Sequence, residues 1–464
     1  MVPTTAPADV AGLPPPPRNP LTLRQQIHAV KAFHTGQEVL RDAGGHVTRL
    51  KNGPAWLTPE AVVATSPQAA RDILGGTGSA AERTPAHDEV RSLLGASLFT
   101  LKHDPWLARR RALQPVFTKQ NVRAFGGHMA QVADIVAASW SDGQQVDLDA
   151  ECRRLTLRAL GRSVLGIDLN ERADAIAEPL RTALGYVTAR VTSPVRAPRW
   201  LPTPARQRAR AAAATLRRLA AEVLQACRDD PTREAPLVRA MIAATDPATG
   251  RPLTDDEIRN ELIVFMSAGH DTTATTLTYA LWALGRHHPD MQDRLCAEAA
   301  AIGDRELTPD DVPRLRYTVQ VLHEALRLCP PAPSIPRLIT RDIEVDGYLV
   351  KAGTVCAIGV YAMHRDPTLW DRPLEFDPDR FSPENTPNRD RWQYIPFSAG
   401  PRTCIGDHFA MLEATLALAT IIRRTEIRSL NDDFPLALPF TMVAAAPIRA
   451  QVNARTPRLT ERSR

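Results

Sequence analysis

A ten-residue segment near the C-terminus constrains this chain more than any other feature. Residues 397–406 read Phe-Ser-Ala-Gly-Pro-Arg-Thr-Cys-Ile-Gly, and the apolar periodicity that follows predicts a helix from about Gly406 to Arg423. Cys404 therefore lies at a helix N-terminus, where free backbone N–H groups and the positive end of the helix dipole favour a thiolate over a thiol. A thiolate in that position can bind a metal ion.

The other fixed positions of this segment suit a bound flat, anionic group. Gly400 and Gly406 remove side chains where the backbone must turn tightly and approach such a group, and Arg402 supplies a fixed cation for a carboxylate. Phe397 is expected to pack beside the sulfur and limit access of water. A lone cysteine is usually a buried structural residue, but here all five positions of F-x-x-G-x-R-x-C-x-G are matched.

The segment resembles the haem-binding loop of the cytochrome P450 superfamily. The resemblance implies haem b as the cofactor, Cys404 as the thiolate ligand of its iron, and activation of O2, because the thiolate pushes electron density onto the iron and favours O–O cleavage. Motif-level similarity extends in the family's order from about Leu98 to Leu418. It implies the cytochrome P450 fold.

A second motif, Ala268-Gly269-His270-Asp271-Thr272-Thr273, lies inside a long predicted helix. Gly269 costs about 1 kcal/mol of helix stability relative to Ala, so a glycine at this position indicates a packing or functional role. Small residues at Ala268 and Gly269 let a flat cofactor and O2 lie against the helix, and Asp271 and Thr272 can relay protons. The alternative is a buried helix whose hydroxyls bond their own backbone. The segment resembles the family's oxygen-activation groove.

Further residues match family positions around the haem. Trp106 and Arg110, preceded by His103, resemble the W-x-x-x-R of the helix that contacts a haem propionate, and Arg337 matches another propionate-binding position. Spacing alone does not decide which of Arg109, Arg110 and Arg111 faces the haem. The motif Glu324-x-x-Arg327, together with Arg380, looks like the family's buried Glu-Arg-Arg network, which supports the haem loop.

The pattern along the chain predicts a mainly α protein with a smaller β-sheet region. Helical periodicity dominates residues 105–330: one helix spans Ala205 to Ala226, another follows the capping box of Thr254 and Glu257 to about His287, and a third runs from about Thr308 to Pro330. Strands are expected near residues 45–65, 338–360 and the C-terminus. Residues 1–40 are interpreted as a Pro-rich extension and lead-in, and 41–464 as one catalytic domain.

Composition excludes several classes of protein. The chain has 57 basic and 52 acidic residues that are dispersed, so no nucleic-acid partner is expected. Its six cysteines form no disulfide framework, and no apolar run is long enough for a membrane anchor. The Pro-rich start lacks the features of a secretory signal, which predicts a cytoplasmic protein.

The resulting hypothesis is a monooxygenase that hydroxylates or epoxidises a small hydrophobic substrate, in the lipid, terpenoid, steroid or polyketide class and within secondary metabolism. Because the chain ends 60 residues after Cys404, electrons are expected from a separate ferredoxin or flavodoxin with its NAD(P)H-dependent reductase. A monomer is expected. The alternatives are a peroxide-dependent peroxygenase, a non-catalytic haem sensor, and a cysteine hydrolase, for which no oriented partner of Cys404 is evident.

Substrate contacts are assigned by position in the family. An apolar pocket is expected, with the segment from Tyr186 to Pro204 as its lid. The residues assigned to the pocket are Leu98, Phe99, Val264, Ala268, Ser334, Ile335 and Met442.

Overall fold

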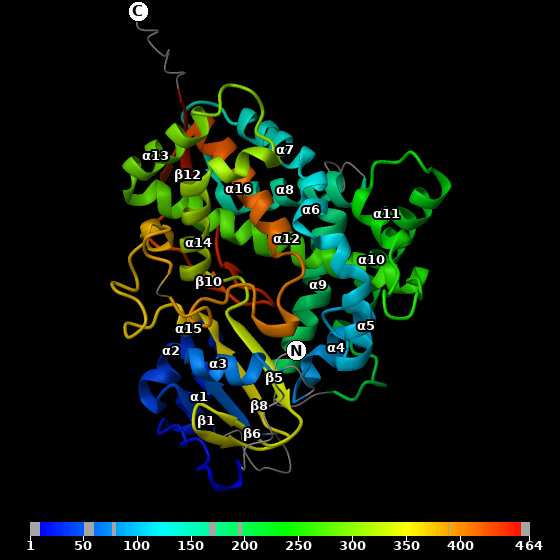
Figure 1. Cartoon of the computed structure of the whole chain (residues 1–464), viewed down its shortest axis with the longest axis vertical. Coiled ribbons are helices and arrows are strands. Elements are labelled where there is room, and N and C mark those ends of the chain that lie inside the picture. The colour runs from blue at the N-terminus through cyan, green and yellow to red at the C-terminus, as the bar shows by residue number, and fades with distance from the viewer. Residues whose placement is uncertain are drawn as a thin grey trace, which may run out of the picture.

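Most of the chain is helical, and the largest sheet lies at one end of the molecule (Figure 1). The computed structural model describes residues 10–50, 60–76, 80–166, 173–193, 197–387 and 389–455. The α-helices are α1 (Leu23–Lys31), α2 (Phe33–Gly44), α3 (Pro67–Leu74), α4 (Pro85–Leu94), α5 (His103–Leu113), α6 (Lys119–Phe125), α7 (Gly127–Ala138), α8 (Leu148–Leu160), α9 (Ala173–Thr192), α10 (Pro204–Asp229), α11 (Pro236–Ala243), α12 (Asp255–His287), α13 (Pro289–Ala300), α14 (Arg316–Leu328), α15 (Val360–Met363) and α16 (Asp407–Arg424).

The strands form small sheets from distant parts of the chain. They are β1 (Val47–Leu50), β2 (Ala61–Ala64), β3 (Ala81–Glu82), β4 (Gln144–Asp147), β5 (Ser334–Ile339), β6 (Ile343–Val345), β7 (Tyr348–Val350), β8 (Val355–Gly359), β9 (Thr425–Ser429), β10 (Leu436–Ala437), β11 (Val443–Ala444) and β12 (Arg449–Ala454). The largest sheet has the order β1-β2-β8-β5-β3, in which only β2 and β8 are parallel. The mainly α class with a smaller sheet region is thus confirmed, although 51–59 lie outside the described residues.

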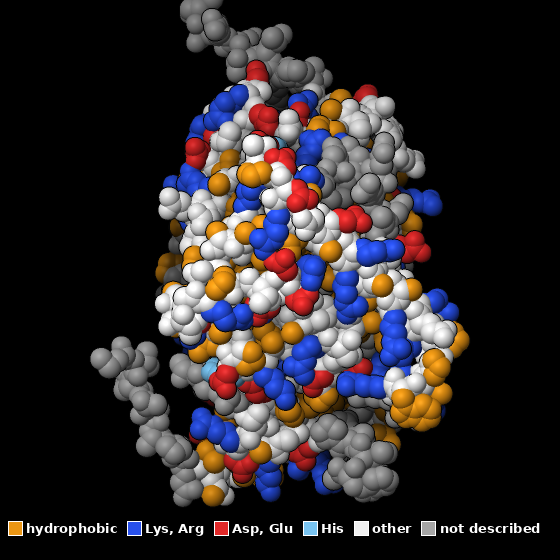
Figure 2. Space-filling view, turned by 90° about the vertical axis from the view of Figure 1, so that its right-hand side faces the viewer, with side chains coloured by type: hydrophobic (Ala, Val, Ile, Leu, Met, Phe, Trp, Pro, Cys, Tyr) orange, Lys and Arg blue, Asp and Glu red, His pale blue; other side chains and the backbone are white. Residues whose placement is uncertain are grey.

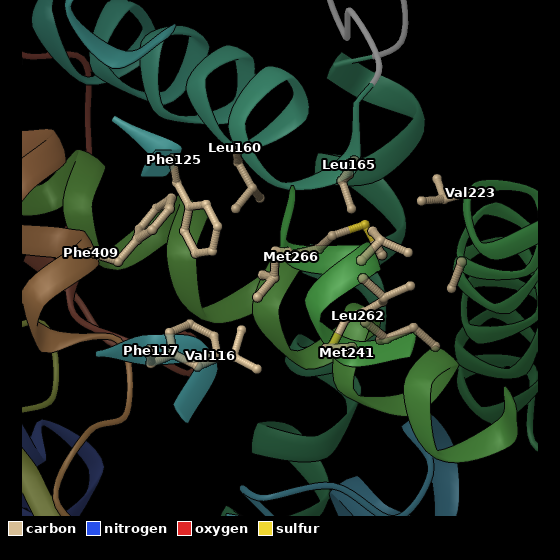
Figure 3. Packing of buried hydrophobic residues seen from close by; sticks show 14 of the residues in the cluster. Val116, Phe117, Phe125, Leu160, Leu165, Val223, Met241, Leu262, Met266 and Phe409 are labelled. Atoms are coloured by element: carbon tan, nitrogen blue, oxygen red, sulfur yellow. The ribbon is translucent and has the colours of Figure 1, made fainter. Parts of the chain in front are cut away.

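Helix α12 runs through the middle of the helical layer (Figure 1). Its start is capped as expected, because the Thr254 side chain accepts from the Glu257 N–H and the Glu257 carboxylate accepts from the Thr254 N–H. Leu262 and Met266 are fully buried in a hydrophobic cluster, and Leu262 lies beside Met241 of α11 (Figure 3). Among the described residues, no helix is both long and apolar enough to span a bilayer.

Two helical regions differ from expectation. The helix expected from Thr308 begins as a 3-10 segment, Pro309–Arg314, and becomes α14 only at Arg316, because Pro313 has no N–H to donate and its ring obstructs the preceding turn. The expected lead-in contains α1 and α2, which the sequence analysis did not predict. Gln37 of α2 donates to the Pro333 carbonyl at 2.9 Å, so this helix is tied to the chain that enters β5.

A buried ion-pair network joins α14 to the long segment before the Cys404 loop. Arg327 donates two hydrogen bonds to Glu324, each of 2.7 Å, and both side chains are fully buried. The Nε of Arg380 lies 3.3 Å from the same carboxylate. Arg327 also donates to the His364 carbonyl at 2.8 Å, and the His364 ring accepts from the Ile395 N–H at 3.0 Å. The network therefore extends to the irregular segment at Ile395, just before Phe397.

Removing the central carboxylate is expected to destabilise the fold. Glu324→Gln leaves two buried guanidinium groups without an anion, so the free energy of unfolding should fall by about 3–5 kcal/mol in urea denaturation. The control is Arg71→Gln, which removes an exposed ion pair with Asp390 (2.8 Å) and should cost less than about 1 kcal/mol. Equal losses in the two variants would contradict a structural role for this network.

Candidate active site

Cys404 lies where the sequence predicted, immediately before α16. Its N–H donates to the Phe397 carbonyl at 2.9 Å, which closes the loop between them. Of the six cysteines, all of which have free thiols, Cys404 alone is exposed, and the others are buried or half-buried. The loop therefore presents one accessible sulfur, as expected for a ligand and not for a structural cysteine.

Groups around Cys404 shift the pKa of its thiol in both directions. Burial among protein atoms raises the pKa of the Cys404 thiol, while the Gly406 N–H and the Arg110 guanidinium lower it. Desolvation is the largest of these effects and opposes the thiolate form that the helix end favours. A coordinated metal ion would favour the thiolate, since a thiol that coordinates a metal loses its proton.

The two glycines of the loop have different roles. Gly400 has φ +72°, and a Cβ there would lie 2.0 Å from the Leu74 carbonyl oxygen, so only glycine fits. Gly406 has an ordinary φ of −98°, and a Cβ there would be 4.0 Å from the Cys404 Sγ. Its glycine is therefore not required by a tight turn, and what it provides is open space beside the sulfur.

Helix α12 contains an exposed residue within the protein interior. Ala268 is exposed, although Met266 and His270 on either side of it are buried. Val264 and Thr272, one turn away in each direction, are half-buried. An exposed stripe in the middle of a central helix indicates open space against this face, which suits a flat cofactor.

Gly269 does not face that space. A Cβ on Gly269 would lie 3.2 Å from the Leu160 side chain of α8, so the glycine allows α12 and α8 to pack closely. The sequence analysis assigned Gly269 to cofactor binding. The contact that the structure shows for it is with Leu160 of α8. A close helix crossing offsets the helix-propensity cost of this residue.

Asp271 and Thr272 make separate contacts. The Thr272 hydroxyl donates to the Ala268 carbonyl at 2.6 Å, which is the back-bonding that the alternative interpretation described. Asp271 forms an ion pair with Arg153 of α8, which also pairs with Asp149 at 2.7 Å. No local sequence pattern marks Arg153 as part of the site. This arginine bridges two acids and is only partly exposed.

Four residues chosen from the sequence line one cavity. His103 and Trp106 of α5, Arg337 of β5 and Arg402 of the Cys404 loop all border it, although they are far apart in the sequence. The Arg402 guanidinium stacks over the Trp106 ring at 4.5 Å and donates to the Leu101 carbonyl at 2.9 Å. The cavity therefore brings two arginines together, with Asp72 as the acid among its lining residues, and the arginines can hold carboxylates.

The three consecutive arginines of α5 have different interaction partners. Arg109 is buried in ion pairs with Glu261 (2.7 Å) and Glu257, and Arg111 pairs with Asp246 (2.9 Å). Arg110 instead donates to the Thr403 carbonyl at 3.1 Å. Arg110 is therefore the one of the three that reaches the Cys404 loop.

The expected pocket residues divide into two groups. Phe99, Val264, Ala268 and Ser334 are exposed or half-buried, and Leu98 and Ile335 are buried. Met442 is wrong as a lining residue, because it is fully buried in the core and its carbonyl accepts from Thr275. Phe440, which the sequence analysis missed, makes an edge contact with the Phe99 ring at 5.9 Å. Residues 194–196 of the expected lid lie outside the described residues.

Comparisons with known proteins agree with this geometry. The family model described as Cytochrome P450 matches residues 14–454. The chain is 30% identical over 388 residues to cyclooctat-9-en-7-ol 5-monooxygenase of Streptomyces melanosporofaciens, with 83% of each chain covered. It is 31% identical over 419 residues to pentalenene oxygenase of Streptomyces avermitilis, with 89% of this chain and 92% of that one covered.

A solved structure extends the likeness to the fold. The crystal structure of the cytochrome P450DA haem domain aligns with a TM-score of 0.85 at 27% identity, covering 96% of this chain and 99% of that one. The protein belongs to the cytochrome P450 monooxygenase family. Membership implies a haem-thiolate iron cofactor, O2, an organic substrate and redox partners.

The position of Arg110 predicts an effect on the iron. Arg110→Gln removes a cation beside the thiolate, so the midpoint potential of the loaded protein should fall by roughly 40 mV, the equivalent of about 1 kcal/mol in a one-electron couple. Arg111→Gln, which breaks the pair with Asp246, is the matched control and should shift the potential little. A spectroelectrochemical titration measures both, and equal shifts would sink the assignment of Arg110 to the Cys404 loop.

Proposed function

We propose that the protein is a haem b monooxygenase that inserts one oxygen atom of O2 into a terpenoid. The observation that carries the proposal is the pairing of one accessible sulfur, Cys404, with an exposed face on α12 that ends at an acid and a hydroxyl. A single catalytic domain from residue 41 to 464, a monomeric state and a cytoplasmic location complete the proposal.

The chain's residues fit the cofactor at both its centre and its edge. Cys404 would be the ligand of the iron, Phe397, Gly400 and Gly406 shape the loop around the sulfur, and Ala268 would leave room for the cofactor on α12. His103, Trp106, Arg337 and Arg402, which line one cavity, would hold the carboxylates. When bound, the haem activates O2 with two electrons.

Asp271 and Thr272 deliver protons to the reacting oxygen. Arg153 forms an ion pair with Asp271, and Asp149 gives that arginine a second partner. Release of Asp271 from Arg153 lets the carboxyl group take up a proton from water and pass it to the Thr272 hydroxyl. Thr272 can accept that hydrogen bond while it donates to Ala268. A peroxygenase or a haem sensor has no need of this pair.

The substrate class follows from the apolar lining and from the names of the relatives. Phe99, Phe440 and Val264 offer aromatic and aliphatic surface, and the relatives are named for pentalenene and cyclooctat-9-en-7-ol. We infer a cyclic terpene hydrocarbon or alcohol as substrate, placed against Ala268. Apolar burial orients such a molecule with few polar contacts.

Electrons come from a separate ferredoxin or flavodoxin with its NAD(P)H-dependent reductase. Such donors are acidic, and Arg110 and exposed Lys102 of the α5 region offer positive charge near the Cys404 loop. Over the face drawn in Figure 2, basic and acidic side chains are interspersed, which does not resemble the basic stripe of a nucleic-acid binder.

Substitution of the acid–hydroxyl pair tests this function. With ferredoxin, reductase, NADPH and a cyclic terpene, Asp271→Asn should lower the oxygenation rate about 100-fold, the contribution of a positioned general acid. Thr272→Ala should keep O2 consumption but release hydrogen peroxide in place of product.

Thr278→Val is the matched control, since the Thr278 hydroxyl is also back-bonded, to the Ala274 carbonyl at 2.7 Å, but is fully buried. It should leave the ratio of product to O2 unchanged. Oxygenated product formed at wild-type yield by Asp271→Asn and Thr272→Ala would contradict the relay. No oxygenated product from wild type with any cyclic terpene would contradict the substrate class.

A further inference from the structure

A fully buried glutamate of α12 holds the loop between α4 and α5, residues 95–102, which is called the α4–α5 loop below. The Leu98 N–H donates to both carboxylate oxygens of Glu261, at 2.9 and 3.2 Å. Arg109 of α5 donates to the same carboxylate at 2.7 Å, and the Glu261 side chain has no exposed area. One buried carboxylate therefore joins the loop, α5 and α12.

The neighbouring residue of α12 contacts the start of the same loop. Gly95 has φ +100°, and a Cβ there would lie 2.2 Å from Oδ1 of Asn260, so only glycine fits. Within the loop, the Ser97 N–H donates to the Thr100 hydroxyl at 3.0 Å, and the Thr100 N–H donates to the Ser97 carbonyl at 2.9 Å. Because the loop is a hydrogen-bonded turn, its two contacts with α12 fix its orientation.

The residue that follows Leu98 belongs to the proposed substrate pocket. Phe99 is half-buried, and its ring makes the edge contact with the Phe440 ring at 5.9 Å. Glu261 and Ala268 are seven residues apart, which is two helical turns, so they share one face of α12. The open face of α12 therefore has a buried acid near one end, and that acid holds the loop that carries Phe99.

Ion pairs balance the charge of this acid. Arg109 also pairs with Glu257, one turn earlier on α12, and Arg251 pairs with Glu257 at 2.7 Å. Burial raises the pKa of Glu261 to about 7, whereas Arg109 and the Leu98 N–H lower it. The loop N–H thus favours the charged carboxylate, and the charged carboxylate in turn favours the loop in this position.

We propose that Glu261 is a positioning residue for the substrate, because its hydrogen bond to Leu98 holds Phe99 against Phe440 as a fixed aromatic wall beside α12. This inference rests on the proposed function and deepens it, since it concerns how a cyclic terpene is oriented. An apolar molecule offers few polar groups for orientation, so the rigidity of the surrounding wall selects which carbon faces the iron. When the loop is released, more than one orientation is accessible.

Glu261→Gln tests the proposal, because the amide keeps the shape of the side chain but loses the charge. The haem-loaded protein is titrated at about pH 8, above the pKa of Glu261, with a cyclic terpene and with 4-phenylimidazole, an apolar ligand whose nitrogen binds haem iron. Both Kd values should rise about fivefold, the effect of one aromatic contact. With the terpene, kcat should fall less than about twofold and the number of product isomers should increase.

A double-mutant cycle with Phe99→Ala separates positioning from general destabilisation. In the Phe99→Ala background, Glu261→Gln should change neither Kd further. Asp246→Asn is the matched control, because Asp246 is also a buried carboxylate that pairs with an arginine of α5, Arg111, at 2.9 Å. Its other side-chain hydrogen bonds stay within residues 246–249, so this variant should keep the wild-type Kd values and products.

Gly95→Ala displaces the α4–α5 loop at its other contact with α12 and leaves the ion pairs of Glu261 intact. It should raise both Kd values in the same direction as Glu261→Gln. Thermal melting of each haem-loaded protein shows whether Glu261→Gln still folds, and Gly95→Ala carries the comparison if it does not.

Three results would overturn the inference. The first is wild-type Kd values and products in both Glu261→Gln and Gly95→Ala. The second is an increase in Kd that is just as large in the Phe99→Ala background. The third is an equal increase in Asp246→Asn, which assigns the effect to loss of any buried carboxylate. Wild type that binds 4-phenylimidazole but no cyclic terpene contradicts the proposed substrate class instead, and the 4-phenylimidazole series then decides the role of Glu261.

Discussion

The buried pair of Glu324 and Arg327 is the interaction on which the rest of this structure depends. Arg327 is fully buried and satisfies its donors with one carboxylate and with the carbonyls of His364, Pro373 and Glu375. Those carbonyls belong to an irregular segment that has no sheet or long helix to hold it. Because Arg327 is buried and paired with Glu324, its hydrogen bonds to these carbonyls hold the irregular segment that leads to Cys404 in place.

Electrostatics differ sharply between the two ends of the site. At the sulfur, one partly buried cation, Arg110, lies beside a group whose pKa burial raises. At the opposite edge, Arg337 and Arg402 lie near Glu82, and burial lowers the pKa of Arg337 to about 10. An iron porphyrin with two carboxylates would supply a cation at Cys404 and anions at the cavity.

Much of this arrangement was predictable from the sequence because it depends on local patterns. The start of α12 follows from Thr254 and Glu257, the start of α16 from the loop that ends at Gly406, and the ligand from Cys404. The residues around the haem edge were found only by resemblance to a family, since His103 and Arg337 are 234 positions apart and no local pattern links them.

The residues that sequence analysis missed depend on tertiary contacts. Arg153 meets Asp271 only because α8 crosses α12, and Glu261 meets Leu98 only because the α4–α5 loop packs against α12. The close approach of Gly269 to Leu160 of α8 is likewise a tertiary contact that helical spacing does not reveal. Sequence motifs therefore predicted the type of chemistry, whereas the residues that contact the motif residues were found only in the folded structure.

The carbon monoxide difference spectrum of the reduced protein, recorded beside Cys404→Ala, tests the central claim most directly. The account predicts a Soret band at the long wavelength diagnostic of thiolate ligation in wild type and its loss in the variant, with Cys296→Ala, a half-buried cysteine on α13, unchanged. An imidazole-type band that is the same in all three proteins would contradict Cys404 as the iron ligand.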